Sequence, residues 1–165
     1  MKTNLKSALL IAFMAASVPA LALRVAYIDI KKAFDGYDQT KVAKEKLKKQ
    51  AEGEKIKIEK EQDKLSKKLE ELGSQKKALA ESKYKEREGA IRGEIDTLKS
   101  KVQSVQNDLA GQEQKMTEQI LDEIRETVHK VADREKYDYV FEKSTLMYGG
   151  IEITASVISE LNAKK

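Results

Sequence analysis

A continuous stretch without proline, from Lys31 to Lys136, constrains the fold of this chain more than any other feature. Lysine, glutamate, glutamine, leucine and alanine dominate this stretch, and all five are strong helix formers. High charge and low aromatic content are, however, also typical of disordered chains. The spacing of the apolar residues therefore has to decide between long helices and disorder.

Apolar residues recur every seven positions in the second half of this stretch, in two stripes offset by four residues. This is the a/d pattern of a coiled coil, and it predicts helices over disorder. The first half carries one such stripe. After Met116 the apolar residues follow at steps of four, four, four and three, which on average exceed 3.6 residues per turn, so the supercoil is predicted to relax or reverse there. The seam residues are Tyr84, Ile91, Leu98 and Val105; Ile95, Val102, Leu109 and Met116; and, in the first half, Ile58, Leu65, Leu72 and Leu79.

Net charge divides the stretch into two halves of opposite sign. Residues 31–85 hold 17 basic and 11 acidic side chains, a net charge of +6, whereas residues 86–136 hold 9 and 12, a net charge of −3. Opposite charge favours two segments that lie side by side. The sequence therefore predicts an antiparallel helical hairpin over residues 38–134.

Two positions compete for the reversal of this hairpin. Gly73-Ser74 is the strongest helix-breaking pair, but a turn there leaves arms of about 42 and 60 residues. A reversal near residues 80–84, with Ser82 as the N-cap, makes the arms nearly equal and leaves no apolar stripe unpaired. We therefore expect the reversal near residues 80–84, with Gly73 as the alternative.

Four short segments near the two ends of the chain are rich in β-branched or aromatic residues, which indicates strands. They are Arg24–Ile30, Tyr137–Glu142, Leu146–Tyr148 and Ile151–Ile153. Gly149-Gly150 provides a turn before the last of them. Thr154 is predicted to cap a closing helix that ends near Asn162.

These patterns predict an α+β fold that is mostly α. A small β body would form from residues 23–37 and 135–165, and a long antiparallel coiled-coil hairpin would protrude from it. Short strands leave exposed sheet edges that other copies of the chain would cover, so we expect an oligomer. The residues expected to form this oligomerisation body are Val25, Tyr27, Ile28, Phe34, Tyr139, Val140, Phe141, Leu146, Tyr148, Ile153, Val157, Ile158 and Leu161.

Residues 1–22 have the layout of a secretory signal peptide. Lys2 and Lys6 precede the apolar run Ala8–Val18, Pro19 interrupts it, and small residues follow. The run is too short to cross a membrane, which takes about 20 residues. We expect export and cleavage after Ala22; an uncleaved anchor is the alternative.

The side chains needed for most active sites are scarce. The chain has no cysteine and a single histidine, His129, which excludes disulfides and leaves little from which to build a metal site or a catalytic triad. No glycine-rich phosphate-binding motif is present. We expect no enzymatic activity, no cofactor and no metal. Nucleic-acid binding is disfavoured by export and by the nearly balanced charge of the mature chain.

Both ends of the chain resemble the Skp/OmpH family of periplasmic chaperones. The resemblance rests on Val25–Asp29 followed by Phe34, on Tyr137–Phe141, and on Tyr148–Thr154 followed by Val157-Ile158 and Leu161-Asn162. It implies a homotrimer whose strands form a common β-barrel-like body, with three helical hairpins around a central cavity.

The resemblance also implies a function. Family members hold unfolded outer-membrane proteins in that cavity, in the periplasm and without ATP, and pass them towards the outer-membrane assembly machinery. An exported structural coiled-coil spacer or adaptor is the alternative function. The sequence does not identify the clients or the arm residues that touch them, and no sequence feature supports contact with the membrane or lipopolysaccharide.

Overall fold

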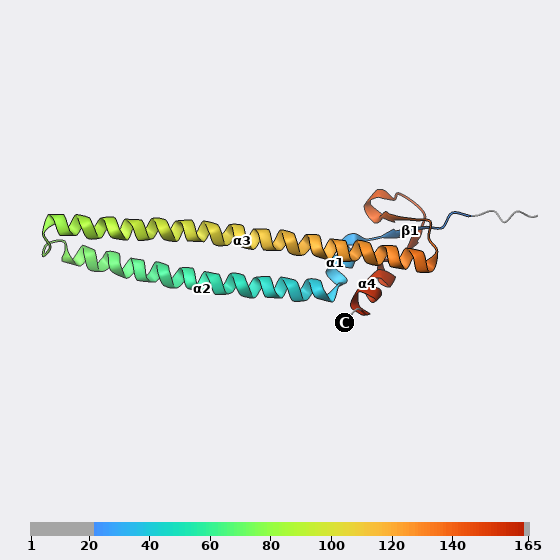
Figure 1. Cartoon of the computed structure of the whole chain (residues 1–165), viewed down its shortest axis with the longest axis horizontal. Helices are drawn as coiled ribbons and strands as arrows, with labels where there is room; N and C mark the ends of the chain where they lie inside the picture. Colours follow the sequence, from blue (N-terminus) through green and yellow to red (C-terminus); the bar gives the residue numbers. More distant parts are fainter. Residues whose placement is uncertain (1–21, 164–165) are drawn as a thin grey trace, which may run out of the picture.

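The protein is described by a computed structural model that covers residues 22–163, and its shape is a small body with one long helical hairpin (Figure 1). All of the predicted signal peptide except Ala22 lies outside the described residues. The elements are β1 (Val25–Ile28), α1 (Ile30–Gly36), α2 (Asp38–Gln75), α3 (Glu81–Glu135), β2 (Tyr139–Glu142), the 3₁₀ helix η1 (Lys143–Thr145), β3 (Ile151–Glu152) and α4 (Thr154–Ala163).

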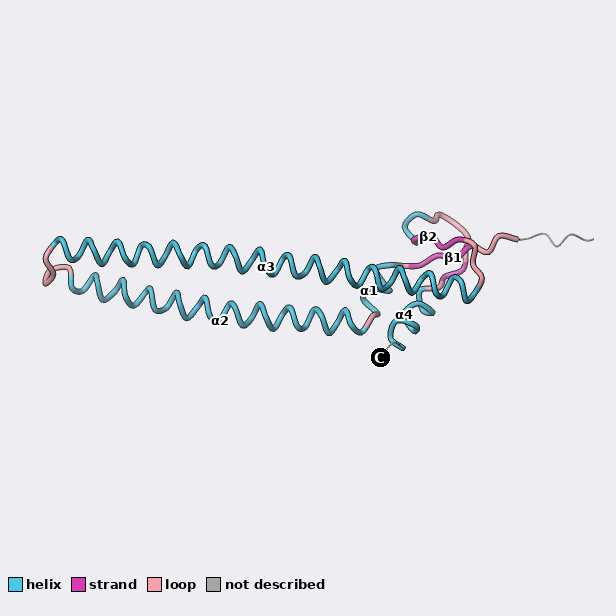
Figure 2. Tube along the Cα trace, in the orientation of Figure 1, coloured by secondary structure: helices cyan, strands magenta, loops and turns pink. Residues whose placement is uncertain are grey.

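The hairpin consists of α2 and α3, which run side by side in opposite directions (Figure 2). Helix α2 has 38 residues and α3 has 55, so they are roughly 57 Å and 82 Å long. The expectation of equal arms is therefore wrong. The additional part of α3 continues past the start of α2 into the body, where α1 and α4 pack against it. Because the body covers that part of its apolar stripe, α3 needs no equally long partner.

The chain reverses at residues 76–80, between the two positions that the sequence suggests. Gly73 is still helical, in the last turn of α2. Ser82 lies inside α3, and the N-cap is Ala80, whose backbone is extended and whose methyl group cannot accept a hydrogen bond. The proposed Ser82 cap is thus incorrect. The reversal follows from where the seam ends, at Leu79 and Tyr84, rather than from a capping side chain.

The body contains a three-stranded parallel sheet in the order β2-β1-β3. The prediction of a strand at Leu146–Tyr148 is wrong, because these residues follow η1 in an irregular loop. The loop carries the chain from one side of β1 to the other, so it cannot lie in the sheet. Gly149 and Gly150 make the return turn with φ of 85° and 86°, values that favour glycine.

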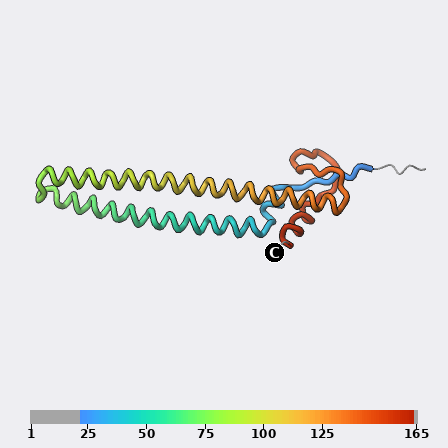
Figure 3. Tube along the Cα trace, in the orientation of Figure 1, coloured from blue at the N-terminus to red at the C-terminus, as the bar shows by residue number. Residues whose placement is uncertain are grey.

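Helices cover one face of the sheet and complete the main core, which lies where the hairpin meets the sheet. Figure 3 shows that the N-terminal segment (blue) and the C-terminal segment (red) come together at this end of the hairpin. Thr154 is the first residue of α4, and its hydroxyl bonds no amide of that helix, so the prediction that it caps α4 is wrong. Its hydroxyl accepts a hydrogen bond from the Asp29 amide at 3.0 Å and donates one to the Glu152 carboxylate at 3.1 Å, so it ties α4 to β1. The buried apolar residues of this core are Ala26, Ile28, Ala33, Tyr37, Ile120, Ile124, Val131, Ile153, Val157 and Leu161.

The predicted mostly helical α+β fold, with a small sheet and a long hairpin, is confirmed. Within residues 22–163, no helix combines the length and the apolar character that crossing a membrane requires.

Candidate functional site

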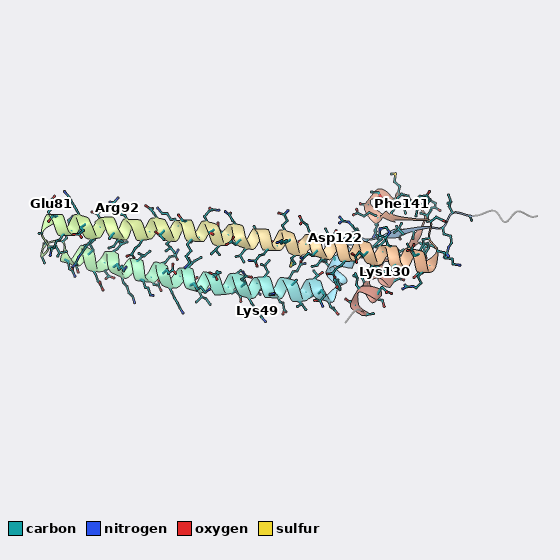
Figure 4. All side chains as sticks on the ribbon, viewed as in Figure 1. Lys49, Glu81, Arg92, Asp122, Lys130 and Phe141 are labelled. Carbon is teal, nitrogen blue, oxygen red and sulfur yellow. The ribbon has the colours of Figure 1, made fainter. Side chains whose placement is uncertain are left out.

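The sheet has one aromatic face that no helix covers. Val25 and Tyr27 of β1 are paired in register with Tyr139 and Phe141 of β2, so all four side chains share a face. The rings of Tyr139 and Phe141 stack with centroids 6.2 Å apart, and 55% and 42% of these two residues remain exposed. Figure 4 shows Phe141 on the outer side of the body.

The loop before β3 adds two more exposed apolar side chains to this region. Met147 and Tyr148 are almost completely exposed, and they line a small cleft together with Tyr27. We call Tyr27, Tyr139, Phe141, Met147 and Tyr148 the aromatic patch. Contiguous exposed apolar surface of this kind marks protein–protein contact sites.

An ion pair fixes the base of this loop. Lys143, at the start of η1, lies 3.2 Å from the carboxylate of Asp29, which also accepts a hydrogen bond from the amide of Lys32 at 3.0 Å. The Lys32 hydrogen bond first, and Lys143 second, hold the pKa of Asp29 below its ordinary value. The loop is therefore anchored at its base, while its apolar tip stays uncovered in the single chain.

The two outer strands offer unpaired backbone. Within the described chain, β2 and β3 each pair only with β1, so the outer edge of each strand has free amide and carbonyl groups. Such edges readily pair with another chain. The body thus combines an aromatic face with two open edges.

The hairpin carries its own apolar cluster near the tip, built from seam residues. Leu65, Leu72, Ile91 and Leu98 are buried there, with Ile58, Leu79, Tyr84, Ile95 and Val102 packed around them. One side of this cluster is open as a groove of about 520 Å³, and Leu69 on its wall is 46% exposed. We call this the arm groove; its apolar lining is Leu65, Leu69, Ile95, Leu98 and Val102.

Between this cluster and the body, the two helices of the hairpin separate around a polar cleft of about 670 Å³. All of α2 is described, and none of its residues between Thr40 and Leu65 is buried; the same holds for α3 between Leu98 and Ile120. The seam residues Val105 and Leu109 are only half-buried at the cleft. Its polar lining includes Gln50, Glu54, Asn107, Asp108, Gln112 and Lys115.

Charged side chains cover the outer sides of the arms, as Lys49 and Arg92 illustrate in Figure 4. Two ion pairs cross between the helices: Lys68–Glu94 at 2.6 Å and Lys101–Glu61 at 2.5 Å. Both agree with the opposite net charges of the two segments. Because all four side chains keep 39–49% of their surface exposed to solvent, each pair contributes less than about 1 kcal/mol and acts mainly on the pairing of the arms.

The described residues contain no cluster of three or more histidine, aspartate or glutamate side chains arranged to hold a metal ion. His129 is exposed on α3.

The structure distributes the residues predicted for the body over three environments. Ile28, Ile153, Val157 and Leu161 are buried; Val25, Tyr27, Phe34, Val140, Leu146 and Ile158 are half-buried; Tyr139, Phe141 and Tyr148 are exposed. The residues predicted for the body do not include Ala33, Tyr37 and Met147, although Ala33 and Tyr37 lie in the range 23–37 that was assigned to it. Tyr37 could have been found from its position at a helix boundary, whereas the exposure of Met147 had no signal in the pattern.

A small parallel sheet, a long helical hairpin and an uncovered aromatic patch define a class of elongated proteins that present arms from a compact body. The chain belongs to the family of OmpH-like outer membrane proteins, whose family model matches residues 24–161. Its fold is similar to that of a candidate OmpH-like outer membrane chaperone from Caulobacter crescentus CB15. That similarity has a TM-score of 0.82 at 17% identity and covers 87% of this chain and 86% of the other. No curated protein matches this chain.

Proposed function

We propose that this chain is an ATP-independent, non-enzymatic holding chaperone for unfolded outer-membrane proteins. The observation that carries the proposal is the OmpH-like match over residues 24–161, together with a hairpin whose apolar arm groove remains open to solvent. The Caulobacter protein of the same fold is described as a candidate outer membrane chaperone, which supports the same assignment.

The aromatic patch and the open strand edges support assembly into a homotrimer. In a cyclic trimer the β2 edge of one copy would contact a surface of the next copy other than its own β2 edge. Because the ring is closed, the aromatic patch of every copy would be covered. The strands of the three copies would form a common β-barrel-like core, and the three hairpins would enclose a cavity. Burial of Tyr139 and Phe141, now 55% and 42% exposed, would provide much of the association free energy.

The arms suit a client that has no fixed shape. An unfolded outer-membrane strand is apolar at alternate positions, so it needs many weak contacts rather than a rigid pocket. The arm groove offers aliphatic side chains, and Lys99 on its wall would attract acidic segments of a client and speed its capture. Clients would be released without nucleotide, because the sequence has no nucleotide-binding motif.

The predicted signal peptide and the OmpH-like family both support a periplasmic location for this activity. From there the clients would pass to the outer-membrane assembly machinery. The competing function is that of a structural spacer, which needs the hairpin but no open apolar groove.

A light-scattering assay separates the two functions. A urea-unfolded outer-membrane protein is diluted into buffer without ATP, with and without a stoichiometric excess of this protein. A holding chaperone suppresses the rise in turbidity, whereas a spacer leaves it unchanged. Leu69→Gln, in the arm groove, should weaken the suppression. The matched control Lys67→Gln, at an exposed site nearby on the same helix, should retain it.

A further inference from the structure

The bend between α1 and α2 leaves two backbone groups without a helical partner. Tyr37 separates the helices with an extended backbone (φ −78°, ψ 125°), so the carbonyl of Gly36 ends one helix and the amide of Asp38 begins the next. Asn162 of α4 bonds both groups. Its Oδ1 accepts a hydrogen bond from the Asp38 amide at 2.9 Å, and its Nδ2 donates one to the Gly36 carbonyl at 3.1 Å.

Close packing brings Asn162 to this position. A Cβ atom at Gly36 would lie 2.8 Å from Cδ1 of Ile158, so the glycine allows α4 to approach the bend. Leu161, next to Asn162, is fully buried in the core and fixes the last turn of α4. The contact therefore depends on residues about 125 positions apart in the chain, and the C-terminal helix completes a helix cap that the local sequence lacks.

The bend matters because the contacts that attach α2 to the body are confined to its N-terminal end, around Tyr37 and Thr40. Helix α3 runs unbroken from the arm into the body, so packing of its C-terminal part fixes its direction. After Thr40, the next buried residue of α2 is Leu65, and the polar cleft lies beside Gln50 and Glu54 between these points. The start of α2 is consequently the fixed point from which this part of the arm extends.

We propose that Asn162 is a positioning residue that locks the base of α2 to the body and so sets the separation of the two arm helices. The functional consequence of this inference rests on the proposed function. In a trimeric chaperone, the separation of the two arm helices would determine the size of the cavity between the arms. The geometry itself can be measured without any client, so failure of the chaperone assay would leave this inference untouched.

Two measurements on the full chain test the role of Asn162. Hydrogen exchange of the Asp38 amide should become about tenfold faster in Asn162→Ala, because one hydrogen bond is lost. Because the chain has no cysteine, Lys49→Cys and Lys130→Cys provide unique sites for spin labels on α2 and α3. With labelled chains diluted into unlabelled ones, the distance distribution between these labels should broaden in the same variant.

Two further variants make the test specific. Asn162→Asp keeps the acceptor for Asp38 and loses the donor to Gly36, so it should retain slow exchange at Asp38 and still broaden the distances. Arg134→Ala removes a 2.6 Å ion pair to Glu160 on the same helix α4, and should leave both measurements as in the wild type. Wild-type exchange and distances in Asn162→Ala, or equal changes in Arg134→Ala, would overturn the proposal. If Asn162→Ala does not fold, the distances in Asn162→Asp decide.

Discussion

The hydroxyl of Tyr37, at the bend between α1 and α2, donates a 2.6 Å hydrogen bond to the carboxylate of Glu123 on α3. Tyr37 is only 5% exposed, and this contact joins the two arm helices at the level of the body. Burial, and then the hydrogen bond to Glu123, raises the pKa of Tyr37 to about 12. This relationship has a measurable consequence at high pH.

Tyr37→Phe should remove a pH dependence of stability. The folded pKa of Tyr37 lies above the ordinary value of 10.0, so its contribution is fully present below pH 10 and is lost as the pH rises towards 12. The wild type should therefore lose more stability over that interval than Tyr37→Phe. Urea unfolding at pH 7, 10 and 11.5 gives the comparison, and parallel losses in the two proteins would contradict the assignment.

At neutral pH the same substitution should lower the free energy of unfolding by about 1 kcal/mol, because one hydrogen bond is lost. The loss stays this small because water can solvate the Glu123 carboxylate once Tyr37 no longer donates to it. Glu123→Ala, which removes the acceptor, serves as the second arm of a double-mutant cycle. The cycle should show coupling between the two positions, and strictly additive effects would mean that the hydrogen bond does not contribute to stability.

The polar cleft should close when its facing glutamines become apolar. Gln50 and Gln112 both line the cleft, from α2 and α3 respectively. Gln50→Leu with Gln112→Leu would extend the apolar seam towards the body and raise the free energy of unfolding by about 1–3 kcal/mol. Thermal unfolding followed by circular dichroism measures the gain. Gln103→Leu, at an exposed site of α3, is the control and should have little effect.

The aromatic patch should determine the oligomeric state. Tyr139→Asp or Phe141→Asp places a charge on the apolar face of the sheet, where burial in an interface would be costly. Light scattering should report the mass of a trimer for the wild type and a smaller mass for each variant. Lys49→Ala, on the arm, should leave the mass unchanged. A trimer that persists in both aspartate variants would place the interface elsewhere.

The backbone conformation of Lys136 should lower the free energy of unfolding of the chain. Lys136 ends α3 in the left-handed conformation, with φ of 56° and ψ of 48°, and the Lys136 and Tyr137 amides close the helix by bonding carbonyls of its last turn. A side chain in this conformation costs about 1 kcal/mol relative to glycine. Lys136→Gly should therefore stabilise the protein, whereas Lys130→Gly, inside α3, should destabilise it by a similar amount. Chemical unfolding of both variants checks the two signs.

The helices could be predicted because their signals are local. Seven-residue spacing from Tyr84 to Met116 belongs to one segment and repeats, and opposite charge identifies the segment that lies beside it. The strands Val25–Ile28 and Tyr139–Glu142 were found for the same reason, since β-branched and aromatic residues favour strands regardless of their partners. The segment Leu146–Tyr148 has similar composition and is a loop, because β2 and β3 already occupy both sides of β1.

The candidate site was harder to predict, because the exposure of a side chain depends on whether another element of the fold packs over it. Tyr139 and Val157 are both apolar residues near the C-terminus, but only Val157 faces α3 and the sheet from α4. The cleft beside Gln112 likewise arises from the distance between two helices. No spacing of residues along one helix specifies that distance.

The sequence by itself determined two long helices, an apolar seam between them and short strands at both ends, because periodicity and propensity act over a few residues. Only the tertiary structure decided that α3 extends past the start of α2 into the body, that one face of the sheet stays uncovered, and that Asn162 completes the cap of α2. Each of these features depends on groups brought together from distant positions, such as Asp38 and Asn162, whose hydrogen bond requires the packing of α4 that Leu161 anchors in the core.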